Sequence, residues 1–144
     1  MSHRRKTTRG GPHPVHAIML AFPIALFSSA LATDIAYLRT AEVQWTKFSA
    51  WLISGALLFG GLVLAWALIS LLLGWRRANR NRNLLYVFVV AAMWTLGLVN
   101  ILKHSQDGWY SVETFGLLLS ILCTFLALIA GLIAFTRTER ELAT

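Results

Sequence analysis

Long apolar stretches alternate with short polar joints along the chain. The stretches cover Val15–Tyr37, Trp51–Leu73, Leu84–Leu102 and Phe115–Phe135. At about 1.5 Å of rise per helical residue, each is long enough to cross a hydrocarbon core of about 30 Å. The pattern therefore predicts an all-α protein, a four-transmembrane-helix bundle in residues 13–136, between polar tails at residues 1–12 and 137–144.

Several residues indicate where these helices begin, bend and end. Pro14 suits a first helical position, because the amide it lacks would have no partner there. Pro23 lies inside the first span, where it removes one backbone hydrogen bond and predicts a kink. Thr40 can cap a helix that begins near Glu42, so we expect an interfacial turn or two before the second span. Ser111 is the expected cap of the fourth helix, after a turn at residues 107–108.

Aromatic side chains support the same borders. Amphipathic rings gather where a membrane-spanning helix meets the headgroups. One predicted interface carries Tyr37, Trp45, Trp109 and Tyr110, and the other carries Trp75 and Tyr86.

Composition and charge agree with a membrane protein. The chain has 144 residues, of which 57% are hydrophobic and 13% charged, with a formal net charge of +7. Ten of its 13 Lys and Arg residues lie in the two tails and the joint between the second and third spans. The other three are Arg39, Lys47 and Lys103, on the opposite side of the membrane. Excess positive charge on one side predicts that both termini are cytoplasmic. The basic groups are thus topology determinants near anionic headgroups, and nucleic acid is not predicted as a partner.

Small residues recur at helical spacing and predict how the spans pack. On the first span they are Ala17, Ala21, Ala25 and Ser29, and on the fourth Gly116 and Ser120 begin a similar row. Such rows let helix backbones approach closely in a membrane. We expect a compact bundle with the first helix at the centre of the contacts. Cys123, the single cysteine, is expected to be a buried thiol in the fourth span.

Two histidines stand at the start of the first span. His13 and His16 share a helical face, because they are three residues apart. They could bind a haem b, donate hydrogen bonds to a quinone, or simply form a polar cap at the interface. A haem held by two imidazoles needs histidines on facing helices, which the interior of the spans does not supply. No cofactor and no metal site is therefore predicted, and haem b remains the alternative.

Asp34 is the one acidic residue inside a span. Ionisable groups at that depth are functional candidates by default. Asp34 also lies about a turn from the end of its helix, so an ion pair with Arg39 or Lys103, or a contact with Asn100, is the favoured interpretation. Proton or ion handling is the alternative. His104 is expected in the turn beyond the third span, on the other side of the membrane from His13 and His16.

Three segments of the first span resemble a known family. Residues Gly11–Ile18, Ala21–Phe27 and Asp34–Tyr37 are similar to the opening of the bacterial membrane family called domain of unknown function 2231. That family begins with a His-Pro-x-His element, continues through a Phe-Pro segment, and places an Asp near the end of the helix. The resemblance implies a bacterial inner membrane as the location, and His13, His16, Pro23 and Asp34 as the positions to test. Residues 83–85 and 130–132 depart from the family pattern, which puts a further histidine ligand on the third helix in doubt.

The sequence leaves three functions open. The favoured one is a non-enzymatic accessory or anchoring module, which contacts lipid and packs against another membrane protein or itself. The second is a membrane electron-transfer protein that holds haem b or quinone near His13 and His16. The third is a small oligomeric transporter that works through Asp34.

Overall fold

The structure, a computed structural model, describes residues 13–73, 80–105 and 114–136 and is all-α in these ranges. Its four helices are α1 (Pro14–Thr40), α2 (Val43–Leu73), α3 (Arg80–His104) and α4 (Thr114–Phe135). Each of the four is long and apolar enough to cross a membrane. The all-α fold with four membrane-spanning helices is thus the one that the hydropathy pattern predicts.

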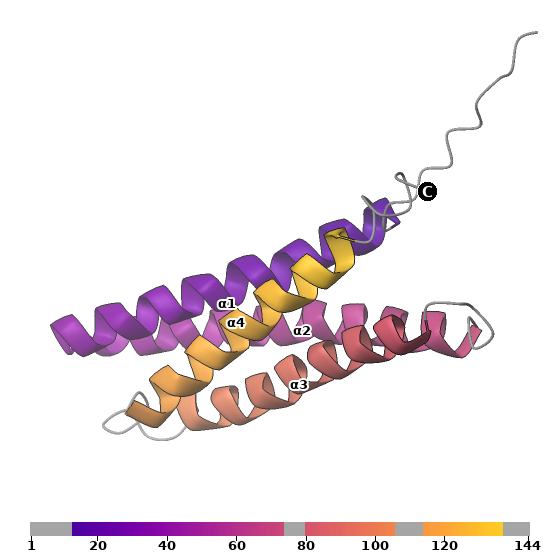
Figure 1. Cartoon of the computed structure of the whole chain (residues 1–144). Helices are drawn as coiled ribbons and strands as arrows, with labels where there is room; N and C mark the ends of the chain where they lie inside the picture. Colours follow the sequence, from indigo (N-terminus) through magenta and orange to yellow (C-terminus); the bar gives the residue numbers. More distant parts are fainter. Residues whose placement is uncertain (1–12, 74–79, 106–113, 137–144) are drawn as a thin grey trace, which may run out of the picture.

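The four helices form a ring in which each packs against two neighbours. Contacts join α1 with α2, α2 with α3, α3 with α4, and α4 with α1, whereas the two diagonal pairs have no Cα atoms within 8 Å of each other. The indigo start of α1 and the yellow end of α4 lie at one end of the bundle, where α2 also ends and α3 begins (Figure 1). We call this the His16 end, and the other the Asp34 end. The first helix is therefore one member of a ring and not the centre of the contacts.

Local chemistry explains the tight connection between α1 and α2. Ala41 takes a left-handed conformation with φ 54°, and its N–H donates to the carbonyl of Tyr37 at 2.8 Å, which closes the last turn of α1. The Thr40 hydroxyl then accepts a hydrogen bond from the Glu42 N–H at 3.4 Å. The second helix begins at Val43, as expected from the early start predicted near Glu42. The expected cap at Ser111 and the turn at residues 107–108 lie outside the described residues.

The third helix is longer at both ends than its apolar core indicates. It begins at Arg80 within the joint predicted before Leu84, and its last helical residue is His104. The prediction that His104 lies in a turn is therefore wrong, and the histidine is buried. A helix can extend past its apolar centre because the backbone N–H of a polar residue still donates to the carbonyl four residues earlier.

Side chains from all four helices fill the centre of the bundle. Its largest fully buried apolar members include Phe27, Leu20, Ile53, Met93 and Val63. Large apolar side chains also cover the outside: Leu73 is 85% exposed and Phe88 is 71% exposed. An apolar exterior of this kind suits a lipid environment, in which apolar side chains face hydrocarbon on the outside as well as each other within.

The predicted packing rows have different outcomes on the two helices. Gly116 and Ser120 of α4 are buried, as a packing role requires. On α1 the row points outward, since Ala21, Ala25 and Ser29 are exposed and Ala17 is half-buried. The buried face of α1 is instead a stripe of larger residues at alternating spacings of four and three: His16, Leu20, Pro23, Phe27, Ala30 and Asp34. The prediction that the small row packs inside this bundle is therefore wrong. Pro23 lies on that buried stripe, and α1 is continuous through it.

Candidate functional site

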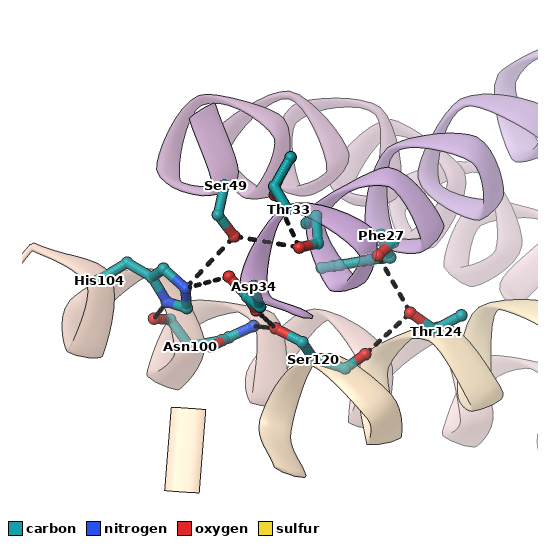
Figure 2. Close-up of polar contacts among 9 residues, drawn as sticks. Phe27, Thr33, Asp34, Ser49, Asn100, His104, Ser120 and Thr124 are labelled. Atoms are coloured by element: carbon teal, nitrogen blue, oxygen red, sulfur yellow. Dashed lines mark hydrogen bonds and ion pairs between the residues drawn. The ribbon is translucent and has the colours of Figure 1, made fainter. Parts of the chain in front are cut away.

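A buried polar network occupies the Asp34 end of the bundle. Its side chains come from all four helices: Asp34 from α1, Ser49 from α2, Asn100 and His104 from α3, and Ser120 from α4 (Figure 2). Each of these residues is at most 5% exposed. A polar group so buried needs a partner inside the protein, and most of those present have one.

The central contact joins Asp34 to His104. The Nε2 atom of His104 lies 2.9 Å from Oδ1 of Asp34, and both side chains are 0% exposed. Their helices, α1 and α3, are diagonal partners with no Cα atoms within 8 Å of each other, so this pair spans the middle of the ring. The sequence prediction of an ion pair for Asp34 is thus right in kind and wrong in partner, because His104 takes the place expected for Arg39 or Lys103.

Hydrogen bonds around His104 indicate its protonation. The Nδ1 atom lies 3.0 Å from the backbone carbonyl of Asn100, which can only accept. The Nε2 atom faces Asp34 and, at 3.3 Å, the hydroxyl of Ser49, whose own proton points to the carbonyl of Ala30 at 3.4 Å. Both ring nitrogens therefore face acceptors, and this pattern fits a doubly protonated imidazolium beside an ionised carboxylate.

A side chain of α4 donates a hydrogen bond to the other carboxylate oxygen of Asp34. The hydroxyl of Ser120 donates to Oδ2 of Asp34, and the amide nitrogen of Asn100 donates to Ser120 Oγ at 2.9 Å. One turn further along α4, Thr124 donates to the carbonyl of Phe27 at 3.1 Å. The expected contact between Asp34 and Asn100 is therefore present only indirectly, through Ser120. Asp34 is a carboxylate with both oxygens occupied by donors from two other helices.

Two buried oxygens near this network lack a partner within the described part of the chain. They are Oδ1 of Asn100 and Oγ1 of Thr46, the latter one helical turn before Ser49. An acceptor buried without a donor costs free energy, about 1–3 kcal/mol.

The predicted histidine pair lies at the other end of the bundle. His16 is buried and its Nε2 atom lies 2.9 Å from the hydroxyl of Tyr86 on α3, a second contact across the same diagonal. His13 is exposed. Both imidazoles lie beside the indole of Trp66 on α2, with ring centroids 5.6 and 5.9 Å from it. His13 and His16 are therefore brought together with each other but not with Asp34.

These donors do not fit a haem held between two facing histidines. His13 and His16 come from one helix, and the side chain opposite His16 is Tyr86. Among residues 13–73, 80–105 and 114–136, moreover, no group of three or more His, Cys, Asp or Glu side chains could hold a metal ion. The polar groups at the His16 end can donate and accept hydrogen bonds, and at the Asp34 end an imidazole and a carboxylate form a buried, charge-assisted hydrogen bond.

Sequence reasoning missed His104 as a member of the site. Its signal lies in the spacing of the buried face of α3, where Met93, Gly97, Asn100 and His104 follow one another at intervals of four, three and four. A helix that continued beyond the apolar stretch places His104 one turn from Asn100 on the same face. Hydropathy alone does not show this continuation, because the apolar stretch ends at Leu102, two residues before the histidine.

Comparisons with known proteins identify the family of the chain. Neither a search of curated proteins nor a search of solved structures gives a match. A family model described as a predicted membrane protein, DUF2231, matches residues 12–137. That range includes all four helices and both polar ends of the bundle. The chain therefore belongs to the DUF2231 family of predicted membrane proteins.

Proposed function

We propose that this protein is a non-enzymatic accessory or anchoring module of a bacterial inner-membrane complex. The observation that carries the proposal is the saturation of Asp34, whose two oxygens are held by His104 of α3 and Ser120 of α4. A carboxylate held in this way fixes the positions of the helices that surround it. A transporter that works through Asp34 would instead need this carboxylate to exchange its partners for a substrate or ion.

The outer face of α1 is the place for a partner helix in this proposal. Ala21, Ala25 and Ser29 recur every four residues and are exposed. Rows of small residues favour close approach of membrane helices, where van der Waals contact replaces the hydrophobic effect. The occupant that we assign to this face is a transmembrane helix of another protein.

The proposed orientation places both termini in the cytoplasm. At the His16 end, Arg80 and Arg82 lie in the first turn of α3, and α1 begins at the same end, preceded in the sequence by four Lys and Arg residues. Of the Lys and Arg residues in the sequence, only three fall in the segments at the Asp34 end: Arg39, Lys47 and Lys103. Reporter fusions should therefore give a cytoplasmic signal near Arg80 and an external signal in the joint after α3. A reversed pair of signals would contradict the orientation.

The accessory role is tested by purification from native membranes in a mild detergent. We expect the full chain to bring down another membrane protein in fixed stoichiometry. Ala25→Leu should release that protein, because the larger side chain keeps the partner helix at a distance. The matched control is Ala65→Leu, which changes an exposed alanine of α2 and should leave the complex intact.

Three results would contradict the proposal. The first is a chain that purifies alone, or only with copies of itself. The second is a complex that tolerates Ala25→Leu as well as it tolerates the control. The third is proton-coupled uptake by liposomes that contain the chain alone and lose uptake with Asp34→Asn, since that result favours the transporter.

A further inference from the structure

Four polar or aromatic rings from three helices meet at the His16 end. His13 and His16 come from α1, Trp66 from α2 and Tyr86 from α3. The imidazole and phenol rings of His16 and Tyr86 meet edge to face, with their centroids 5.8 Å apart. Trp66 is 37% exposed, so the described residues leave part of it uncovered. The arrangement combines a flat aromatic surface with two side chains that form hydrogen bonds.

One nitrogen in this cluster is buried without a partner. His16 is only 7% exposed, and its Nδ1 atom forms no hydrogen bond within the described residues. Its Nε2 atom is occupied by the hydroxyl of Tyr86. A buried polar atom in this state indicates a missing partner, because desolvation without a hydrogen bond is unfavourable.

The hydrogen-bond pattern shows which kind of partner is missing. His16 Nε2 is the one acceptor that the described residues offer to the Tyr86 hydroxyl. If the phenol donates its proton to Nε2, the proton of a neutral His16 must be on Nδ1. The opposite arrangement would leave both the phenol proton and the Nδ1 lone pair without partners. His16 thus presents a buried N–H donor, and the missing partner is an acceptor oxygen.

We propose that the His16 end binds a quinone, with a ring carbonyl oxygen accepting the Nδ1–H of His16. The indole of Trp66 offers a flat surface beside the ring of the ligand, and Tyr86 fixes the tautomer of His16. The site lies near the ends of three spans, where a polar quinone ring can reach it while its apolar tail stays among lipid chains. This binding site goes beyond the accessory role and includes no electron-transfer step.

A lipid ester carbonyl is a second source of the same acceptor chemistry. Ester carbonyls lie at the border of the hydrocarbon core and could reach a donor at the end of a span. They lack a flat ring, however, and would make no use of the exposed part of Trp66. The exposed aromatic surface favours the quinone.

The test uses the full chain, labelled with ¹⁵N-histidine, in nanodiscs of ether-linked lipids that contain no ester carbonyl. Decylubiquinone is added while the ring ¹⁵N resonances are followed by NMR, and His16→Phe assigns the His16 signals. We expect the Nδ1 resonance of His16 to shift saturably at one quinone per chain, whereas the His104 resonances stay in place. Simple partition of quinone into the lipid would not saturate at that ratio.

Two variants and one control complete the experiment. His16→Phe should abolish the saturable binding, which for this variant is followed through quinone retained after gel filtration. Tyr86→Phe should weaken binding by about 3- to 10-fold, because it removes the one hydrogen bond that fixes the tautomer. Thr95→Val, an exposed change on α3, should bind like the natural chain.

The proposal is overturned if His16 shows no saturable shift, or if Tyr86→Phe binds with unchanged affinity. It is also overturned if moving the chain from ether to ester lipids, without quinone, produces the His16 shift and prevents quinone binding. That last result would assign the donor to a lipid. None of these outcomes depends on whether the chain associates with a partner protein.

Discussion

Replacing Asp34 and His104 by alanine, singly and together, measures how strongly their contact holds the bundle. Asp34→Ala leaves the Nε2 atom of His104 with only the longer contact to Ser49, and the hydroxyl of Ser120 without the carboxylate that accepts its proton. His104→Ala leaves a buried carboxylate that keeps only Ser120. The double variant removes both charges at once, so neither is left buried and unpaired. We therefore expect the two single costs to add up to more than the cost of the double variant.

The burial of Asp34 and His104 determines how much unfolding free energy each variant should lose. Hydrogen bonds between membrane helices average about 0.6 kcal/mol in double-mutant cycles and reach about 1.7 kcal/mol. Breaking a buried ion pair by removing one partner costs about 3–5 kcal/mol. Both side chains are 0% exposed and their hydrogen bond is charge-assisted. We therefore expect the free-energy cost of each single variant to lie near the lower end of the range for a broken buried ion pair. Each single change should cost about 3 kcal/mol and the double change about 4 kcal/mol, which gives a coupling of about 2 kcal/mol.

The assay is reversible unfolding in mixed micelles of a mild detergent and sodium dodecyl sulfate, followed by tryptophan fluorescence. A matched control cycle combines Ser54→Ala with Thr95→Ala. Both hydroxyls are exposed and bond only to the carbonyl four residues earlier in their own helix. The control changes should be additive and cost less than about 0.5 kcal/mol each. A coupling below about 0.5 kcal/mol between Asp34 and His104 would refute the view that their contact holds α1 to α3.

Three further changes test the packing. Gly97→Val should destabilise the bundle by about 1–3 kcal/mol in the same assay, because a Cβ there would lie 2.9 Å from a methyl group of Leu57; a neutral result would contradict the close packing of α2 and α3. Trp94→Phe removes a 3.1 Å hydrogen bond to the carbonyl of Leu57 and should cost about 0.5–1.5 kcal/mol by the same measurement. The thiol of Cys123 is 0% exposed and should react with a maleimide only after unfolding, whereas a cysteine at the exposed Ser105, just after the end of α3, should react in the folded protein; labelling followed by mass spectrometry distinguishes them.

Hydropathy could predict the helices because lipid leaves the backbone few alternatives. A long apolar stretch in a bilayer must satisfy its own N–H and C=O groups, and a helix does so within the segment. Hydropathy does not show where a helix begins and ends, because a polar residue can continue the helix beyond the hydrocarbon core. Arg80 and His104 are polar and lie outside the apolar stretch, yet the helix continues through both. Hydropathy measures where lipid begins, and not where the helical hydrogen bonds end.

The choice of packing face could not be read from residue size. In a membrane both the inside and the outside of a bundle are apolar, so the contrast that identifies the buried face of a soluble helix is weak. The row of small residues on α1 could face either the other helices or the lipid, and in the structure Ala21, Ala25 and Ser29 face outward. A better signal was the other stripe of α1, which begins with His16 and ends with Asp34. Two polar side chains on one face of a membrane helix indicate the buried side, because each would be costly in lipid.

The two ends of that stripe explain how a ring of four helices keeps a definite arrangement. Apolar side chains between the ends, such as Leu20 and Phe27, pack by shape and tolerate small shifts of one helix past another. A hydrogen bond tolerates much less, because its strength falls steeply with distance and angle. His16 with Tyr86 and Asp34 with His104 join α1 to α3 at opposite ends of the bundle. Since these helices are not neighbours in the ring, the two contacts also set the positions of α2 and α4, which lie between them.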